Sequence, residues 1–525
     1  MSTQLLVGGR IYSPAAPDAT SMAVTDGTVV WVGEDRPGRA LHPDAEIVDL
    51  DGAFVGPGFV DTHVHTTALG LTLTGLDVAG ARSLRECLDL VRAYAATRDD
   101  AVIWGQGWDE TGWPDSDRGP STAELDDAAP GRAVYLARID AHSAACSSRL
   151  RATAGVPGQD AVTADEHHRV RAAARDLLTT EQRARARTAA LDRAAAHGIV
   201  AVHECSGPDI AGRVDLTELL TTGHGVQVRA YWGQAVSDAE EATALLAATG
   251  AHALGGDLFI DGAIGSRTAW LTEPYADRPH SGTSYLDVDA VTAHLRACTL
   301  AGVQAGFHAI GDGAVAAAVE GFGRVVAELG GPAVASCGHR LEHVEMIGPD
   351  QASQLAAWGV VASVQPGFDA QWGGVDGMYA QALGAERAAA MNPFAAMASA
   401  GVSLAIGSDA PVTPLSPWDS LRAAAHHRTD GSGISPRAAY AAATRGAWRA
   451  GGVRDGLAGT LVPGAPASYA VWDAGELVVT AAKDTVQRWS TDPRSRVPAM
   501  PRLDDDAPNP VCLRTVHRGV TVYER

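Results

Sequence analysis

The sequence lacks the features that define several classes of protein. No apolar run in the 525 residues approaches the length that spans a membrane, and the first residues show no basic stretch followed by an apolar one. The six cysteines are scattered and form no Cys-x-x-Cys pair, which is typical of a reduced protein. These absences predict a cytoplasmic protein that is neither exported nor inserted in a membrane.

Positive charge is also scarce. The 41 Lys and Arg residues face 62 Asp and Glu residues, which gives a net charge of −21. Such a surface repels nucleic-acid phosphates and anionic lipid headgroups, so we expect no nucleic-acid or membrane partner. The charge says nothing about a small neutral substrate, and the small-molecule substrate that we expect follows from the motifs below. Lysine is almost absent, because Lys483 is the only one in the chain. That absence restricts the metal chemistry considered below.

The length suits a large domain with a smaller one. Hydrophobic residues make up 46% and charged residues 20% of the chain, as in ordinary globular enzymes. Short alternating strands with Gly and Asp turns occupy residues 4–55, and a similar pattern returns over 456–525. We predict that segments 1–57 and 456–525 form the two halves of one small β-sandwich.

Between these ends, over 58–455, apolar strands alternate with Ala-rich amphipathic helices, which indicates a parallel sheet wrapped by helices. Eight such strands predict a (β/α)8 barrel of the α/β class. The span between the first two strands is too long for one helix and includes the strand-like run 133–138, so we predict an inserted subdomain at about 75–175. The predicted strand ends are His65, Glu204, Tyr231, Asp261, His308, His343, Gln365 and Asp409.

The first strand carries the strongest chemical signal, Gly58-Phe59-Val60-Asp61-Thr62-His63-Val64-His65. Strand side chains alternate between faces, so His63 and His65 point the same way. Two imidazoles on one face at the carboxyl end of a barrel strand make half of a metal site.

Three later strands end in residues of the same kind. His308 follows Val303-Gln304-Ala305-Gly306-Phe307, and Asp409 follows Leu404-Ala405-Ile406-Gly407-Ser408. His343 ends another run, where His339 lies close enough in sequence to leave open which histidine faces the mouth of the barrel. Alone, each residue is also compatible with a core histidine or a helix cap. Together they predict a metal site.

This pattern resembles the amidohydrolase superfamily, and within it amidohydrolase family 3, which includes N-substituted formamide deformylases. The resemblance covers nearly the whole chain. Its motifs are Gly105-Gln106-Gly107-Trp108-Asp109, Arg138-Ile139-Asp140-Ala141-His142, Asp261-Gly262-Ala263-Ile264-Gly265-Ser266-Arg267-Thr268, His308-Ala309-Ile310-Gly311-Asp312 and Arg340-Leu341-Glu342-His343.

The resemblance implies hydrolysis of a linear amide or related C–N bond, of N-acyl or N-formyl type, with a divalent metal, by default zinc. It implies metal ligation by His63, His65 and His308, with Asp409 as ligand and proton shuttle. His343 is either a ligand or a catalytic group. The alternatives are lactone or ester hydrolysis or deamination at the same site and, in another class, an inactive binding or regulatory relative. The complete His and Asp set opposes the last alternative.

The chain departs from the resemblance on the fourth strand. Many relatives carry a carboxylated lysine there that bridges two metals, whereas Asp257 stands at the equivalent place in this chain. No carboxylated lysine is therefore expected. Either one metal is held by the three histidines and Asp409, which we favour, or a carboxylate bridges two metals, with Glu204 as the first candidate.

Residues that the resemblance places over the mouth are candidates for substrate contact, or else simply pack the inserted subdomain. A homodimer is the working expectation for the assembly. The candidate substrate contacts are Trp108, Trp113, Asp140, His142 and Arg267.

Overall fold

The computed structural model describes residues 2–139, 143–479 and 497–525. The chain divides into two compact units. The larger unit comprises Met1–His65, Leu191–Pro208 and Gly223–Arg525, and the smaller unit comprises Thr66–Ala190 and Asp209–Thr222. Within the described residues, no helix is long and apolar enough to cross a membrane.

Eight parallel strands form the centre of the larger unit. They make two four-stranded sheets, ordered β15-β14-β13-β7 and β16-β17-β18-β19. Single parallel bridges, Leu254↔Ala305 and Val64↔Ala410, link the ends of one sheet to the other. The eight strands are β7 (Phe59–Val64), β13 (Ile199–Ser206), β14 (Gln227–Trp232), β15 (Ala253–Leu254), β16 (Gly306–Ala309), β17 (Arg340–His343), β18 (Val361–Val364) and β19 (Ser403–Ile406).

The predicted barrel strands are therefore present, but as two sheets rather than one continuous closed sheet. The predicted end of the fourth strand at Asp261 is wrong, because β15 stops at Leu254. Gly255 and Gly256 follow it, and Gly256 has a φ of 70°, which an extended strand does not contain. A parallel bridge between Phe259 and His308 restores contact with β16 beyond this break.

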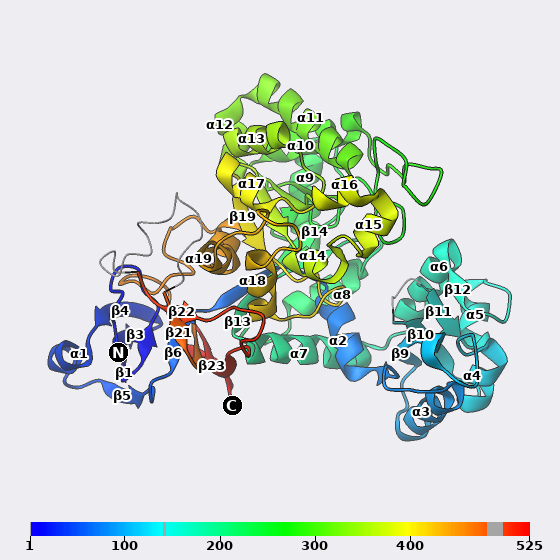
Figure 1. The fold of residues 1–525 in the computed structure, drawn as a ribbon, viewed down its shortest axis with the longest axis horizontal. Helices are drawn as coiled ribbons and strands as arrows, with labels where there is room; N and C mark the ends of the chain where they lie inside the picture. The colour runs from blue at the N-terminus through cyan, green and yellow to red at the C-terminus, as the bar shows by residue number, and fades with distance from the viewer. Residues whose placement is uncertain (1, 140–142, 480–496) are drawn as a thin grey trace. The chain divides into compact units, whose positions relative to one another are not determined.

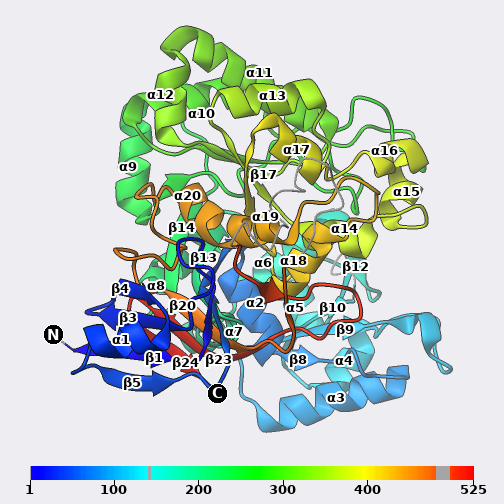
Figure 2. The same ribbon diagram turned by 60° about the vertical axis from the view of Figure 1, so that its left-hand side comes forward.

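Helices connect these strands, as parallel pairing requires. A representative case is α10 (Val288–Ala301), where the Asp287 side chain accepts a hydrogen bond from the Ala290 N–H and Gly302 ends the helix with a φ of 67°. Figures 1 and 2 show α10 beside α11. Other connecting helices are α9 (Ala239–Thr249), α11 (Asp312–Leu329), α12 (Gly331–Cys337), α13 (Pro349–Ala357), α14 (Pro366–Trp372), α17 (Phe394–Ala400), α18 (Pro417–Ala425) and α19 (Pro436–Ala441).

The two chain ends meet in one sheet. Strand β6 (Phe54–Pro57) from the first end pairs antiparallel with β20 (Tyr469–Asp473) from the second, in the order β2-β6-β20-β23-β24. A second sheet, β4-β3-β1-β5, shares a buried apolar cluster with it, which includes Met22 and Val471. The remaining strands are β1 (Thr3–Val7), β2 (Arg10–Ile11), β3 (Ser21–Thr25), β4 (Thr28–Gly33), β5 (Glu46–Asp49), β23 (Val511–His517) and β24 (Val520–Glu524).

The smaller unit has a five-stranded sheet of its own, ordered β12-β11-β10-β9-β8. The run expected as a strand is β10 (Ala133–Arg138). The unit begins and ends outside the predicted span of 75–175. Its other main elements are β8 (Leu76–Asp77), β9 (Val102–Trp108), β11 (Ser143–Cys146), β12 (Val162–Thr163), α2 (Thr66–Thr74), α3 (Leu84–Thr97), α4 (Thr122–Ala128), α5 (Ser148–Ala154), α6 (Ala164–Asp176) and α8 (Gly212–Leu220), and α7 (Thr180–Ala196) begins in it.

Candidate metal centre

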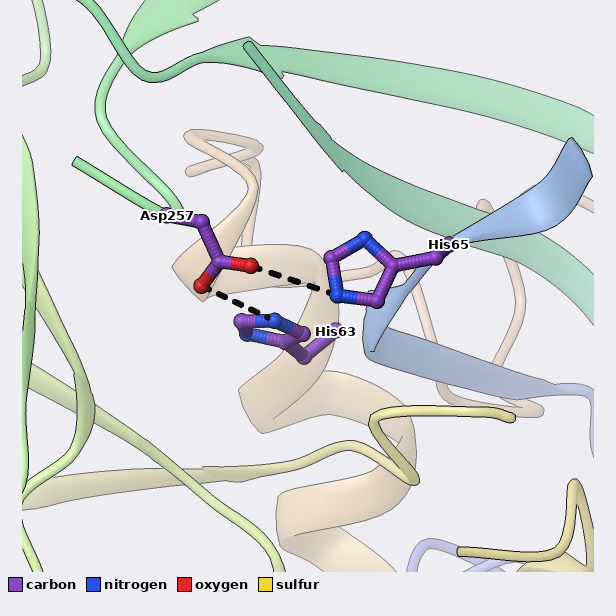
Figure 3. Close-up of side chains that lie close together, drawn as sticks. All are labelled: His63, His65 and Asp257. Atoms are coloured by element: carbon purple, nitrogen blue, oxygen red, sulfur yellow. Dashed lines mark ion pairs between the residues drawn. The ribbon is translucent and has the colours of Figure 1, made fainter. Parts of the chain in front are cut away.

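The His-x-His pair lies at the carboxyl end of β7. His63 is completely buried and His65 is partly exposed. Nε2 of His63 lies 3.3 Å from Oδ1 of Asp257, and Nε2 of His65 lies 3.2 Å from Oδ2 of the same carboxylate. Figure 3 shows the Asp257 carboxylate facing both rings, with one oxygen toward each. The prediction that both rings point the same way agrees with this geometry.

Two further histidines reach the same carboxylate from neighbouring strands. Nδ1 of His308, on β16, lies 3.4 Å from Oδ1 of Asp257. Nε2 of His343, at the end of β17, lies 3.9 Å from that oxygen. Four imidazoles from three strands therefore surround one buried aspartate.

Asp409 adds a second carboxylate beyond the end of β19. Its Oδ1 lies 3.2 Å from Nε2 of His65 and 3.6 Å from Nε2 of His63. Its backbone N–H donates to the His63 carbonyl over 2.7 Å. Asp61 ties the same two segments together, because its Oδ1 accepts the N–H groups of His63 and Ser408. Asp409 is thus held at the end of the first strand by backbone contacts.

The backbone is strained where these residues emerge. His343, Val344 and Asp409 have φ values of 69°, 52° and 55°, in the left-handed region that side chains disfavour. The β-branched Val344 makes this conformation especially unfavourable. Such strain is retained when surrounding contacts fix the backbone, and it is common at functional sites.

Contacts on the far side of three of the four rings fix which nitrogen faces the centre. His63 Nδ1 lies 3.0 Å from Oε2 of Glu342, and His343 Nδ1 lies 2.7 Å from Oε1 of Gln365. Nε2 of His308 lies 3.1 Å from the Gly262 carbonyl oxygen, which can only accept, so this nitrogen carries the proton. When neutral, these three rings present a lone pair toward Asp257, the arrangement that metal ligation needs.

A buried arginine completes the support of His63. Arg340 is completely buried, and its Nη2 lies 2.9 Å from Oε2 of Glu342. Its Nη1 lies 2.8 Å from Nδ1 of His203, and its guanidinium stacks over Tyr231 at 4.0 Å from the ring centre. The Arg340 charge thereby keeps Glu342 ionised, because it holds the pKa of that carboxyl at about 2 against the effect of burial.

The electrostatics of the centre raise the pKa of His63, His65 and His308, whereas burial lowers that of His343. Burial alone would lower the pKa of His65, but the Asp257 and Asp409 carboxylates, each 3.2 Å from its Nε2, outweigh that effect and raise the pKa to about 10. Burial would likewise raise the pKa of Asp257, yet the surrounding histidines hold it well below its usual range. Carboxylates and imidazoles arranged in this way attract either protons or a metal cation.

The donor set fits a divalent metal. Nε2 of His63, Nε2 of His343 and Oδ1 of Asp409 are buried and find no hydrogen-bond partner among the described residues. Two ligand atoms about 2.1 Å from one tetrahedral ion lie roughly 3.4 Å apart. The nitrogen–oxygen separations of His63 and His65 to the two aspartates, 3.2 to 3.6 Å, match that spacing.

The five predicted ligands are all brought together: His63, His65, His308, His343 and Asp409. His343, and not His339, faces the centre, since the His339 ring binds the Ala305 N–H and the Thr299 hydroxyl. Glu204 is buried on β13, whereas the carboxylates that group with the histidines in the described part of the chain are Asp257, Asp409 and Glu342. The sequence analysis put Asp257 where many relatives carry a lysine and did not assign it to the ligands.

Three of the residues predicted to contact substrate make contacts within the protein instead. Trp108 and Trp113 are buried in the core of the smaller unit, where their indole N–H groups donate to the Leu136 and Ala81 carbonyls. Arg267 forms an ion pair with Asp277, with 2.6 Å between Nη2 and Oδ2, and donates to backbone carbonyls of its own loop. Asp140 and His142 lie outside the described residues. A substrate role for these residues stays a prediction.

Comparison with known proteins places these features in context. A sequence model of the amidohydrolase family matches residues 46–523. Protein LONG AFTER FAR-RED 3 of Arabidopsis thaliana is 27% identical over 461 residues, which cover 80% of this chain and 77% of that protein. N-substituted formamide deformylase of Arthrobacter pascens is 26% identical over 142 residues, 26% of each chain. The crystal structure of an uncharacterized metal-dependent hydrolase from Pyrococcus furiosus is 25% identical and superposes with a TM-score of 0.74, over 89% of this chain and 98% of that one.

Proposed function

This chain belongs to the amidohydrolase family, and on that premise we propose that it is a metal-dependent hydrolase of a linear amide or related carbon–nitrogen bond. The observation that carries the proposal is the convergence of four imidazoles and two carboxylates at the ends of parallel strands. Metal sites for hydrolysis are built from this donor set, at this end of such strands. We take zinc as the resident cation.

Each residue of the centre has a part in the reaction we propose. When bound, a divalent metal acidifies water and polarises a carbonyl group. His63, His65 and His308 would hold it through the nitrogens that face Asp257. Asp409, ionised because the neighbouring histidines lower its pKa against burial, accepts a proton from the attacking water and returns it to the leaving nitrogen. His343, whose pKa burial lowers, stays neutral and either binds metal or orients the carbonyl.

The proposed substrate class rests on similarity to a known enzyme. The local match to N-substituted formamide deformylase supports an N-formyl or N-acyl compound as substrate. Chemistry at the metal centre alone would also serve esters, lactones or exocyclic amines, because each is attacked by activated water. We therefore propose the amide class and treat the others as competing outcomes of the test.

The fold that carries the site is part of the proposal. We propose that the two parallel sheets are the halves of one (β/α)8 barrel, which the bridges Leu254↔Ala305 and Val64↔Ala410 support. We also propose that the two sheets built from the chain ends form one β-sandwich, which their common buried cluster supports.

A substrate screen tests the function. Purified protein loaded with Zn²⁺ is offered N-formyl amines, N-acyl amines, esters, lactones and aminopurines, and Asp409→Asn protein serves as the matched control. We expect hydrolysis of the amides by the wild-type protein and at least about a 10²-fold lower rate in the variant. Hydrolysis of esters alone, or of no substrate by metal-loaded protein, would contradict the proposal.

A further inference from the structure

We propose that Trp372, with Phe368 behind it, receives an aromatic or large apolar group of a neutral amide substrate. Both residues lie on α14, and together with Tyr379 we call them the aromatic wall. The inference rests on the proposed function, because it names the substrate class of the same site. It assigns specificity to side chains that are not metal ligands.

The aromatic wall begins against the metal centre. The Phe368 ring lies nearly parallel to the His343 ring, with 5.8 Å between the ring centroids and 11° between the planes. Trp372 follows at 5.0 Å from Phe368, and Tyr379 of α15 (Met378–Leu383) lies 6.3 Å from Trp372. Residues four apart share one face of a helix, so Phe368 and Trp372 are in contact one after another, starting at His343. Figures 1 and 2 show where α14 and α15 lie in the larger unit.

Other apolar residues of the same cluster also follow the carboxyl ends of strands. Ile264 lies beyond β15, Ile310 directly follows β16, and Met346 lies just beyond β17. Ligands of parallel α/β folds bind on this side, because the loops that follow the strands converge there. The apolar cluster and the metal centre therefore share one end of the strands.

The outer end of the aromatic wall offers apolar surface. Phe368 and Tyr379 are only 4% and 2% exposed, whereas Trp372 and Met378 are half-buried. Val375, in the loop between α14 and α15, is 82% exposed. Covering such surface with an apolar group is favourable, and a methionine side chain adapts its shape to the group that covers it.

Contacts at both ends of α14 hold the wall in place. Gln365 precedes the helix, and its Oε1 lies 2.7 Å from Nδ1 of His343. Asp369, within the helix, accepts the Arg428 N–H over 2.7 Å. A surface that is already ordered loses little conformational entropy when a ligand binds, so the wall is suited to select by shape.

Two charged side chains beside the aromatic wall, Arg267 and Glu345, already have partners. Arg267 contacts the sulfur of Met378, but its guanidinium pairs with Asp277 and donates to two backbone carbonyls of its own loop. Glu345 accepts hydrogen bonds from the Tyr379 hydroxyl and from a neighbouring amide. A substrate carboxylate here would have to displace Asp277 or lose its water without a new partner, and either costs free energy. The wall therefore favours a neutral group.

Substrate pairs that differ in apolar size test this inference. Zn²⁺-loaded protein is given N-methylformamide and N-phenethylformamide, which differ on the amine side, and N-methylacetamide and N-methylhydrocinnamamide, which differ on the acyl side. N-formylphenylalanine adds a carboxylate to the phenethyl compound. The same compounds are given to Trp372→Ala and to the control Trp358→Ala, whose indole is also half-buried but packs on Phe322. Melting temperatures verify that each variant is folded.

We expect the larger amide of at least one pair to have a kcat/KM about 10- to 100-fold above that of the smaller one. The ratio within that pair should fall by at least about fivefold in Trp372→Ala and stay unchanged in Trp358→Ala. N-formylphenylalanine should be a poorer substrate than N-phenethylformamide. Equal values within both pairs, an unchanged ratio in Trp372→Ala, or a preference for N-formylphenylalanine would overturn the inference while leaving the hydrolase intact. Hydrolysis of none of these amides would instead contradict the proposed function.

A ketone gives a second readout that needs no turnover. Benzylacetone carries a carbonyl group and an aromatic end but no carbon–nitrogen bond to cleave, and acetone is its small counterpart. With dissociation constants measured by ligand-observed nuclear magnetic resonance, we expect wild-type protein to bind benzylacetone at least about 10-fold more tightly than acetone. Trp372→Ala should lose most of that preference. Equal affinities of the wild-type protein for the two ketones would overturn the inference, even if Trp372→Ala cannot be purified in folded form.

Discussion

Oε2 of Glu342 lies 3.0 Å from Nδ1 of His63, and both side chains are completely buried. Glu342 is in turn ion-paired with Arg340. The Arg340 guanidinium, the Glu342 carboxylate and the His63 ring, which faces Asp257, are therefore in contact one after another. This contact fixes the tautomer of His63 and makes its other nitrogen a better donor to a cation.

The Glu342 contact predicts a loss of metal affinity. Glu342→Gln keeps the size of the side chain but removes the anion, so we expect Zn²⁺ affinity to fall by about 10- to 100-fold. Competition with a chromophoric chelator measures it. Glu345→Gln is the control, because Glu345 is another buried carboxyl but binds the Tyr379 hydroxyl and the Asn392 amide instead of a histidine. Equal affinities in both variants would show that Glu342 has no part in metal binding.

The histidines should separate into ligands and structural residues. His63→Ala and His65→Ala are each expected to lose tightly bound metal, because each removes a nitrogen that faces Asp257. His339→Ala should keep the metal and instead lose about 1–3 kcal/mol of stability, because the Ala305 N–H is left without its acceptor. Elemental analysis and urea unfolding give the two measurements. Normal metal content in the His63 and His65 double variant would refute the assignment.

Much of the centre could be predicted because its residues end strands. His63, His65, His308 and His343 each follow an apolar run, and parallel strands bring their carboxyl ends to one edge. Asp257 was harder to assign, because its role depends on how far the Gly255–Gly256 break lets the backbone approach β16. A sequence pattern reports which side chains share a face, but it does not report that distance.

The fold, like the centre, could be predicted from the sequence only in part. The strand over Ala133–Arg138 was predicted with its correct bounds, since apolar residues there are bounded by turns. The fourth barrel strand was predicted seven residues too long, at Asp261 instead of Leu254, because the apolar run after the glycines looks like a continuation. The ion pair between Arg340 and Glu342 was also not predicted from the sequence, because a buried ion pair depends on tertiary neighbours rather than on local periodicity.

Removal of residues 456–525 should give insoluble protein. Strand β6 would lose its partner β20, and buried residues such as Val55 would lose the cover of Val471. An exposed strand edge beside apolar surface promotes aggregation. The soluble fraction after expression measures the effect, and co-expression of 456–525 as a separate chain is the control that should restore solubility. A soluble truncated protein with normal metal content would show that the two ends fold independently.

Stability should fall in mild acid because of a buried histidine. The ring of His294 is completely buried, its Nδ1 accepts the Val236 N–H, and burial lowers its pKa to about 4. The unfolded chain has a pKa of about 6.5 and binds the proton first, so stability is lost as the pH falls from about 6.5 to 4. Each such histidine contributes up to about 1.4 kcal/mol per pH unit. Urea unfolding at several pH values should therefore give a shallower slope of stability against pH for His294→Gln than for the wild-type protein, and an equal slope in the two proteins would contradict the prediction.

Asp409→Asn should abolish turnover and leave the fold intact. The Asp409 backbone is fixed by its N–H bond to the His63 carbonyl, which the substitution does not touch. Its Oδ1 is buried without a hydrogen-bond partner among the described residues, and an amide there keeps the shape but cannot carry a proton. We expect kcat and kcat/KM to fall together by at least about 10²-fold, as for loss of a group that acts in the transition state. Metal analysis and the melting temperature establish that the variant is otherwise intact. If kcat on a verified substrate stayed near the wild-type value in a metal-loaded variant, another residue would be the proton shuttle, and His343 would be the next one to change.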